Sequence, residues 1–334
     1  MPAIALSGLP SGPGERKVAP MEAQRAAEIF ADQRSYLLGV SYRLTGSWVD
    51  AEDLVAEAWP RWERHAAEVL EPRAWLTRVV GRLSLDHLRS ARVRRETYVG
   101  PWLPEPLVTA VPVGSAGGGG QGLVGGSASS DPETDPLGIL VRDESVRMAF
   151  LVVLDQLTPE QRLAVVLHDV IGMDFADVAE VIGCSVVAAR QHASRGRRRL
   201  AEADPAPRPA AELAWSVLGE MSSALFAGDV DRLTQLLAPG VVLTSDGAGK
   251  VTAARRRVVG ADDVGRFLSG LGARYGQDIT VEPVLVNGDP GFLIRIDSAR
   301  PQDAKVSVYT VALRGQLIVA VYAVLAPEKL TRLP

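Results

Sequence analysis

The sequence of 334 residues contains a single cysteine, Cys184. One thiol excludes a disulfide framework and any cysteine-based zinc site. No apolar run approaches the length of a membrane span, and Met1 does not open a basic stretch followed by an apolar one. These absences predict a cytoplasmic protein.

Aromatic residues are also scarce, at 5% of the chain, although apolar residues make up 47%. Leu, Val and Ala must therefore fill most of the interior, and the length indicates two or three domains rather than one core. The formal net charge of −4, taken as an average, argues against a nucleic-acid binder. The arginines are clustered, however, and clustered charge creates a strong local field.

Composition and hydrophobic periodicity divide the chain into six segments. They are a disordered lead-in (1–24), a helical segment (25–97), a linker that is first Pro-rich and then Gly/Ser-rich (98–136), a second helical segment (137–203), a Pro-rich linker (204–210) and a last segment (211–334). The last segment changes character, because two helices at 211–227 and 229–237 precede β-like runs that one helix at 261–274 interrupts. The β-like runs are 241–244, 251–259, 279–286, 292–296, 305–313 and 317–325. This pattern predicts an α+β domain with a mostly antiparallel meander.

An acidic helix start without basic residues lies in the first helical segment. Its candidate binding residues are Asp50, Glu52, Asp53, Leu54 and Glu57. Acids also stabilise a helix N-terminus on purely structural grounds, so both interpretations stay open here. Pro60 removes one helical hydrogen bond and predicts a kink or a break. Trp59, Trp62 and Trp75 stand at core positions of helices and are predicted to pack inside.

An Arg-rich helix follows at 72–95, with seven arginines against one acid, Asp86. The arginines are Arg73, Arg78, Arg82, Arg89, Arg92, Arg94 and Arg95. Arg78, Arg82 and Arg89 fall on one stripe, and Leu76, Val80 and Leu83 fall on another. Such a helix packs on one side and offers guanidinium groups to phosphates on the other, although a solvated basic face has the same pattern.

A helix-turn-helix is indicated in the second helical segment. Thr158, Pro159 and Gln161 form a helix start with an N-cap and a capping box. Two helices at 175–182 and 185–200 flank Gly183, and Val186, Ala189, Ala193 and Leu200 share the inward face of the second. The outward stripe can donate to base edges in a major groove. Its members are Arg190, Gln191, Ser194, Arg195 and Arg198.

These residues, in this order, resemble regions 2 and 4 of extracytoplasmic-function (ECF) sigma factors. The resemblance rests on Tyr42–Ser47, Asp50–Asp53, Arg61-Trp62, Arg73–Leu76 and Leu85–Arg92 for region 2, and on Leu157–Arg162, Asp177–Ala179, Ala189–Gln191 and Arg195–Arg198 for region 4. It implies that the acidic helix docks on core RNA polymerase (its β and β′ subunits), that the Arg-rich helix engages the −10 element, and that the helix-turn-helix reads the −35 element of promoter DNA. Cys184 stands where relatives usually have Arg, and a half-buried thiol is favoured over a redox sensor.

The segment 98–107 resembles the linker of the ECF subfamily with a C-terminal SnoaL-like extension, the SigJ-like group. The last segment then resembles a SnoaL/NTF2-like cone, with Asp246–Lys250 and Ala326–Leu330 as altered family motifs. A regulatory interface between this cone and the front of the chain is predicted. Its residues are Tyr98, Trp102, Asp246, Gly247, Lys250, Pro327, Glu328, Lys329 and Leu330.

The resemblance implies no cofactor, no metal and no membrane contact, and it implies a cone with room for a small apolar ligand. All four histidines (His65, His87, His168 and His192) lie outside the cone, which disfavours a polyketide-cyclase-like enzyme. A ligand-sensing DNA-binding regulator without polymerase docking is the other alternative. It leaves the acidic helix and the Arg-rich helix without a role.

Overall fold

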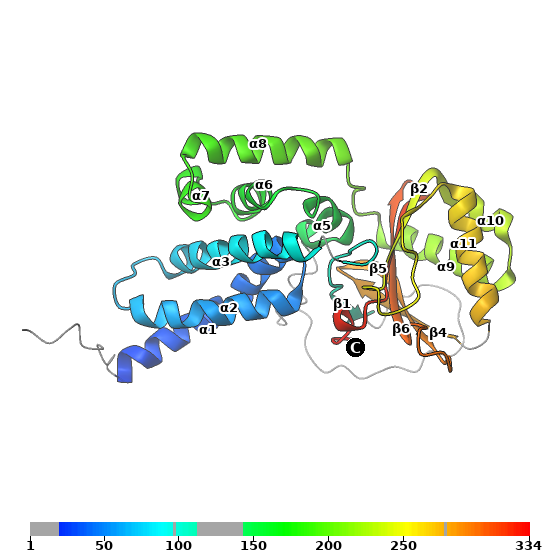
Figure 1. The fold of residues 1–334 in the computed structure, drawn as a ribbon, viewed down its shortest axis with the longest axis horizontal. Coiled ribbons are helices and arrows are strands. Elements are labelled where there is room, and N and C mark those ends of the chain that lie inside the picture. Colours follow the sequence, from blue (N-terminus) through cyan, green and yellow to red (C-terminus); the bar gives the residue numbers. More distant parts are fainter. Residues whose placement is uncertain (1–19, 96–97, 112–142, 277–278) are drawn as a thin grey trace, which may run out of the picture.

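The computed structural model describes residues 20–95, 98–111, 143–276 and 279–334. These residues form two helical bundles and a sheet domain (Figure 1). The parts of the predicted lead-in and Gly/Ser linker at 1–19 and 112–142 lie outside the described residues. Within the described ranges, no helix is both long and apolar enough to span a bilayer.

The first bundle contains α1 (Pro20–Thr45), α2 (Trp48–His65) and α3 (Pro72–Arg95). Helix α1 therefore begins inside the segment that was predicted to be disordered. Ser47 is the N-cap of α2, and its side chain accepts from the Asp50 N–H. Trp62 is fully buried and its indole N–H donates to the Ala26 carbonyl at 2.8 Å, which confirms its core position.

Pro60 does not break α2, which runs on to His65. The proline removes a single backbone hydrogen bond, whereas the neighbouring Trp59 and Trp62 both pack on the core of the bundle and hold the last turns in place. The predicted break is therefore wrong. Trp75 also packs against this core, with its ring 5.8 Å from that of Trp62.

The second bundle confirms the helix-turn-helix. Its elements are η1 (Glu144–Val146), α5 (Met148–Leu154), α6 (Pro159–Val165), the π-helical η2 (Val166–Val170), α7 (Phe175–Ile182) and α8 (Val186–Ala203). Thr158 and Gln161 form the predicted capping box of α6. Gly183 adopts a φ of 76° between α7 and α8, a conformation that favours glycine. Val186 is 36% exposed, so it does not share the inward face as predicted, because it sits on the first, uncovered turn of α8.

The two bundles share one hydrophobic core. Figure 1 shows α3 between α1 and α2 on one side and α6 and α7 on the other. Helices α3 and α7 meet at Gly81, where a Cβ atom would lie 3.1 Å from Val181 and 3.4 Å from Leu167. The absence of a side chain at Gly81 is what lets the bundles approach this closely.

The sheet domain has α9 (Ala211–Ala227), α10 (Val230–Leu236) and α11 (Ala261–Tyr275) on one face of a seven-stranded sheet. The strands are β1 (Val108–Ala110), β2 (Leu237–Asp246), β3 (Val258–Val259), β4 (Ile279–Val286), β5 (Asp289–Ile296), β6 (Val306–Arg314) and β7 (Leu317–Val324), in the spatial order β1-β4-β5-β6-β7-β2-β3. Strands β4 to β7 form the predicted antiparallel meander, and β2 pairs with β7 in parallel. A short turn, η3 (Pro327–Lys329), follows.

Two sequence-based assignments change. Residues 251–257 are not strand, so β3 is only the end of the predicted run at 251–259. Residues 108–110, which were assigned to the linker, form β1 and pair with β4 as an edge strand. An edge strand needs only one neighbour, and so three residues suffice.

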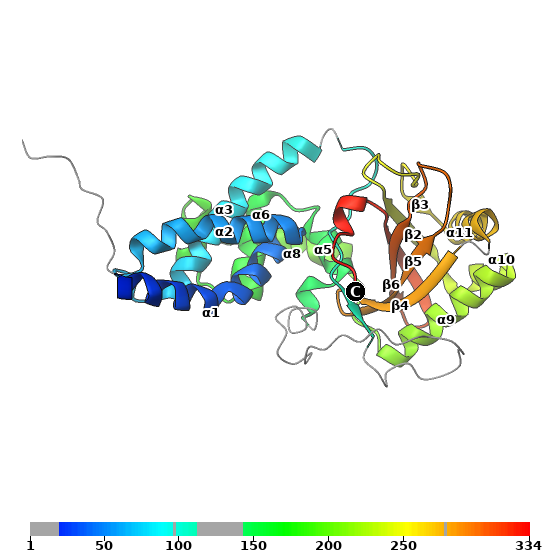
Figure 2. The same cartoon turned by 90° about the horizontal axis from the view of Figure 1, so that it is seen from below.

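The two faces of the sheet serve different parts of the molecule. Side chains on successive residues point to opposite faces of a strand. Helices α9, α10 and α11 cover one face, and the opposite face packs on residues from the front of the chain, including Leu103, Met148 and Ala206. Figure 2 shows the C-terminal turn on the side of the sheet that faces the helical bundles.

Candidate nucleic-acid interface

The acidic face of α2 is only partly open. Asp53 and Glu57 are exposed, whereas Asp50 lies 3.3 Å from the His87 imidazole. Glu52 forms an ion pair with Arg332 in the C-terminal tail. Leu54 is 6% exposed in the core of the first bundle, so it supports the helix from inside and offers no docking surface. The tail thus covers one of the predicted polymerase-binding acids.

The Arg-rich helix α3 faces the second bundle with two of its predicted DNA-binding side chains. Arg78 donates to Asp177 at 2.7 Å, and Glu180 lies 3.9 Å away. Arg89 donates to Glu160 at 3.0 Å. Each of these arginines pairs with an acid of α6 or α7 and stays partly exposed to solvent.

The other arginines of α3 that the structure describes have different surroundings from Arg78 and Arg89. Arg82 is exposed, and the Arg73 guanidinium lies 3.7 Å from the centre of the Tyr36 ring. The side chains of Arg92, Arg94 and Arg95 lie outside the described part of the chain. The Arg-rich helix is therefore partly covered and partly open within the arrangement described.

The outward stripe of α8 is exposed along its whole length, as all five of its predicted −35 residues are. They are Arg190, Gln191, Ser194, Arg195 and Arg198. Figure 1 shows α8 on the outer side of the second bundle, away from α3. Cys184 is half-buried, and burial raises the pKa of its thiol, so the predicted half-buried thiol is confirmed.

Asp246 is the centre of the predicted regulatory interface. Its carboxylate is fully buried and accepts from the Tyr98 hydroxyl at 2.5 Å, the Leu103 N–H at 2.8 Å and the Lys329 ammonium at 2.7 Å. The ammonium also lies 4.3 Å from the centre of the Trp102 ring. We call Asp246, Tyr98, Trp102, Leu103 and Lys329 the Asp246 cluster.

The rest of that interface lies around the cluster. Lys250 pairs with Glu328 at 3.2 Å on the surface. A Cβ atom on Gly247 would meet Ala253 at 2.8 Å, so glycine is needed there for close approach. The backbone of this turn has positive φ at Ala248 and Gly249, at 52° and 71°. Pro327 begins η3, and Leu330 packs against the sheet.

Glu105 was missed by the sequence analysis. It is 3% exposed and its carboxylate accepts from the Trp48 N–H at 2.7 Å, the Val49 N–H at 3.2 Å and the Ser47 hydroxyl at 3.1 Å. Burial raises the pKa of this carboxyl, and the N–H bonds at the start of α2 oppose that rise. A linker residue thus caps the acidic helix, an interaction that no local pattern announces.

Asn287 was also missed. It is fully buried in the β4–β5 turn, and its amide donates to the Tyr42 hydroxyl and to the Val146 carbonyl, both at 2.7 Å. Its side-chain oxygen accepts from the Leu107 N–H at 3.1 Å. One side chain thereby joins the first bundle, the linker and the start of the second bundle to the sheet.

Asp289 extends this contact. Its carboxylate pairs with Arg147 at 2.9 Å and with Arg208 at 3.1 Å, and burial raises its pKa against the effect of both arginines. Asn287-Gly288 between two β-like runs is a sequence signal for a two-residue turn, since both residues adopt positive φ (53° and 81°). That signal locates the turn and says nothing of its partners.

Comparisons with known proteins agree with this geometry. Residues 29–94 match the family description "Sigma-70 region 2" and residues 147–200 match "Sigma-70, region 4". The ECF RNA polymerase sigma factor SigJ of Mycobacterium tuberculosis is 42% identical over 91% of this chain and 93% of its own length. The probable ECF sigma factor SigI of the same species is 32% identical over 80% of this chain and 83% of its own.

Among solved structures, the crystal structure of M. tuberculosis SigJ superimposes with a TM-score of 0.70 at 39% identity. The match covers 91% of this chain and 98% of that one, and thus includes both bundles and the SnoaL-like sheet domain. Two bundles with the region 2 and region 4 patterns, joined to such a domain, place this chain in the family of ECF RNA polymerase sigma factors.

Proposed function

We propose that this chain binds core RNA polymerase through its β and β′ subunits, recognises the −10 and −35 promoter elements, and initiates transcription in the cytoplasm. The observation that carries the proposal is the order of three surfaces along one chain: the acidic face of α2, the arginines of α3 and the exposed stripe of α8. A DNA-binding regulator without polymerase docking needs only the last of them. The relatives named above are ECF RNA polymerase sigma factors, SigJ and the probable sigma factor SigI.

The SnoaL-like domain regulates this activity by holding the two bundles against each other and against the sheet. We call this the closed arrangement. Three contacts support this part of the proposal. The tail residue Arg332 covers Glu52, and the Asp246 cluster and Asn287 hold the linker and both bundles against the sheet. In the same arrangement Arg78 and Arg89 are paired with acids of the second bundle.

Exposure decides which of these contacts matter most. The pairs of Arg78 and Arg89 are partly solvated, and such pairs contribute about 0–1 kcal/mol each. The groups around Asp246 and Asn287 are buried, and leaving one of them unsatisfied costs about 1–3 kcal/mol. Among these contacts the buried ones therefore add most to the core that the two bundles share, and the ion pairs determine what the arrangement covers.

Docking is tested by a pull-down with core polymerase. Reversing the charges of Asp50, Glu52 and Asp53 should abolish binding, while circular dichroism stays that of the wild type, because exposed acids and partly exposed pairs add little stability. Reversal of Glu63, Glu68 and Glu71 is a matched control beyond the acidic helix start. Unchanged binding by the first triple variant would contradict the assignment of this face.

Regulation is tested by run-off transcription at matched concentration. We compare the full chain, a chain that ends at Ala326 and a chain that ends at Glu202. The first truncation removes the Lys329 and Arg332 contacts and should raise transcription. The second removes the whole sheet domain and should change transcription in a different way. Equal activity of all three would reject regulation and leave the sigma-factor role untouched.

A smaller change isolates the Asp246 cluster. Lys329→Met deletes the cation beside Asp246, and Lys305→Met removes an exposed lysine elsewhere on the same domain. The first variant should follow the chain that ends at Ala326, and the second should behave as the wild type. Identical behaviour of both variants would exclude the cluster from regulation.

A further inference from the structure

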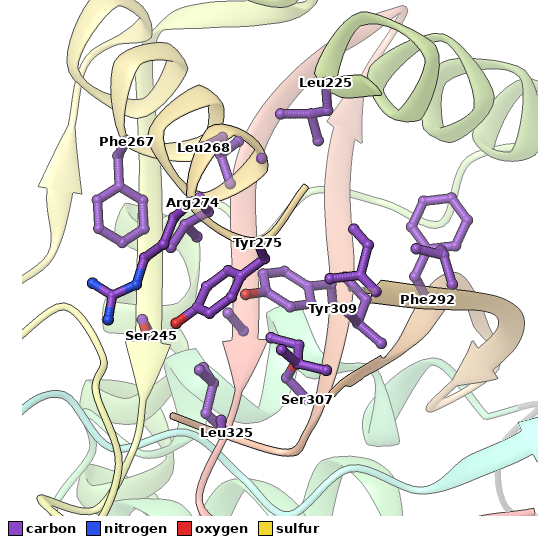
Figure 3. Close-up of a pocket in the computed structure, with 18 of the residues that line it drawn as sticks. Leu225, Ser245, Phe267, Leu268, Arg274, Tyr275, Phe292, Ser307, Tyr309 and Leu325 are labelled. Atoms are coloured by element: carbon purple, nitrogen blue, oxygen red, sulfur yellow. The ribbon is translucent and has the colours of Figure 1, made fainter. Parts of the chain in front are cut away.

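The sheet domain contains a cavity of about 570 Å³ that the sigma-factor role does not use. It lies between the helix-covered face of the sheet and helices α9 and α11 (Figure 3). Leu225, Phe267 and Leu268 line it from the helices, and Phe292 and Ile294 line it from β5. The volume falls in the range of about 300–1,000 Å³ that is typical of small-molecule sites.

Polar groups in the cavity gather on a few residues. Ser307 is 1% exposed and forms a hydrogen bond with the Tyr309 hydroxyl, which also faces the cavity (Figure 3). Arg274 is at the rim, but its guanidinium pairs with the buried Asp303 carboxylate at 3.2 Å. Tyr275 bonds to the same carboxylate. The cavity thus offers hydroxyl groups and no unbalanced charge.

Burial raises the pKa of Tyr309 to about 12, so this phenol stays protonated and neutral at physiological pH. Among the described lining residues there is no carboxylate and no imidazole. General acid–base catalysis needs such groups or an equivalent, so the lining suits binding rather than turnover. A charged ligand would lose its hydration without gaining an opposite charge.

We propose that this cavity binds a neutral, lipophilic small molecule that carries a hydroxyl or carbonyl oxygen. The apolar walls remove the body of the ligand from water, and the Tyr309–Ser307 pair bonds its oxygen. The site is independent of the sigma-factor role, because none of the surfaces for polymerase or promoter DNA contributes to it.

The strands that line the cavity also carry the Asp246 cluster. Ser245 lines the cavity, and the next residue of β2, Asp246, holds the linker. On the β7 side, Leu325 lines the cavity while its N–H donates to the Asp246 carbonyl at 2.7 Å. A bound ligand therefore contacts both strands that position the cluster, and a ligand with different affinities for two strand positions shifts their populations. This coupling rests on the proposed regulation by the sheet domain.

Binding is tested with the full chain and the neutral probe 1-N-phenylnaphthylamine, whose fluorescence rises in apolar surroundings. We expect a saturable rise with one probe per chain. Ile294→Trp fills the cavity and should weaken binding by about tenfold or more, since overfilled sites reject ligands. Arg295→Trp adds the same ring at an exposed position of β5 and should leave binding unchanged. Thermal unfolding of both variants confirms that they are folded.

A saturable rise that is equal in both variants, or no saturable rise in the wild type, would overturn the proposal. Competition then tests the chemistry. 1-Decanol should displace the probe, and decanoate, which is charged at pH 8, should be at least about tenfold weaker. Equal displacement would overturn the neutral character of the ligand. Tyr309→Phe should weaken 1-decanol about three- to tenfold with the probe unchanged, and an unchanged alcohol would remove Tyr309 from the site.

Coupling has its own readout. Saturating probe should alter hydrogen exchange at the Leu103 N–H, which donates to Asp246, and leave the Trp62 region unchanged. Binding without any change at Leu103 would overturn the coupling and keep the site. This outcome is distinct from failure of the transcription tests, which do not involve the probe.

Discussion

The two candidate DNA-binding helices present their arginines in opposite ways. Helix α3 lies on the side of the first bundle that packs on the second, and its Arg78 and Arg89 pair with acids of α7 and α6. Helix α8 lies on the outside and keeps its whole outward stripe exposed. The closed arrangement thus restricts the surface assigned to the opened −10 element and spares the surface assigned to the double-stranded −35 element.

The physical reason lies in the acids that each helix meets. The second bundle places Glu160, Asp177 and Glu180 toward α3, so the second bundle itself supplies the counter-charges. On α8, Arg197 beside the outward stripe pairs with Asp169, and Arg198 of the stripe pairs with Glu202 of the same helix, which leaves both side chains of that pair largely exposed. We therefore expect the closed protein to keep duplex contacts while it loses contacts with single-stranded DNA.

The largest effect should come from Asn287→Gly, which keeps the positive φ but deletes the amide. Three buried partners, on Tyr42, Leu107 and Val146, then lose their bond. We expect about 3 kcal/mol of stability to be lost and the difference between α3 and α8 to shrink as the bundles open. Urea unfolding and binding of single-stranded −10 oligonucleotides measure both. An unchanged urea midpoint would show that the amide does not hold the interface, and Gln316→Gly, which deletes an exposed amide at the β6–β7 turn, is the control.

A second prediction distinguishes contacts with DNA bases from contacts with DNA phosphates. Arg195→Ala on α8 should cost about 1–3 kcal/mol of discrimination between −35 sequences if its guanidinium bonds a guanine. Arg82→Ala on α3 should weaken all sequences alike and lower the salt dependence of binding. Fluorescence anisotropy with promoter variants at several salt concentrations distinguishes the two. The same response from both variants would contradict the proposal that α8 contacts bases and α3 contacts phosphates.

A third experiment frees the covered arginines. Asp177→Asn combined with Glu160→Gln neutralises the carboxylates that bond Arg78 and Arg89, and leaves only Glu180, 3.9 Å from Arg78. Single-stranded DNA should then bind about three- to tenfold more tightly, with little loss of stability because the pairs are partly exposed. Asp169→Asn is the control, since it frees Arg197 on the side that is already open. A gain in the control alone would contradict the covering of α3.

The smallest effect concerns pH. The contributions of Glu160, which pairs with Arg89, and of Glu105, which caps α2, to stability should depend on pH with opposite sign. Burial raises the pKa of Glu160, but hydrogen bonds from the backbone and from Arg89 outweigh burial and leave this pKa below its ordinary value of 4.5. Its contribution is therefore present above pH 4.5 and is lost as the pH falls through the lowered pKa. Burial raises the pKa of Glu105 above 4.5, so its contribution is present below that value and is lost as the pH rises through the raised pKa.

The measurement compares unfolding midpoints of the wild type with those of Glu160→Gln and Glu105→Gln between pH 3 and pH 7. The advantage of the wild type over Glu160→Gln should grow as the pH rises through the lowered pKa of Glu160. Its advantage over Glu105→Gln should decline as the pH rises through the raised pKa of Glu105. Curves of the same slope would show that these carboxyls do not differ in the way their surroundings indicate.

Local signals in the sequence were sufficient for most of the helices and strands, and the family motifs supplied several residues of the predicted interface. Thr158 and Gly183 define where helices of the second bundle begin and end, and alternation along 279–325 predicts the meander. The residues that the family motifs placed at a regulatory interface, such as Tyr98 and Asp246, are brought together by the structure. Their roles in regulation remain proposals.

What the sequence could not supply are contacts between distant positions. Tyr42 and Asn287 are separated by 245 positions, and Glu105 caps a helix that begins 57 positions earlier. No periodicity extends over such a distance, so neither partner could be identified. The predicted helix break at Pro60 was wrong for a related reason. The prediction used only the local propensity of proline, and the tertiary packing of the neighbouring tryptophans outweighs that propensity.

The separation between Tyr42 and Asn287 along the chain also means that the two residues are synthesised at different times. A ribosome completes both bundles before it adds the β4–β5 turn, and it adds the tail that covers Glu52 after that turn. At ~5–20 residues per second, the interval between residue 203 and Asn287 is roughly ten seconds. A nascent chain therefore exposes the acidic face of α2 before the tail that covers Glu52 exists. We expect a chain that is still being made to present this face uncovered, and the contacts of Asn287 and Arg332 to form only once the sheet domain has been made.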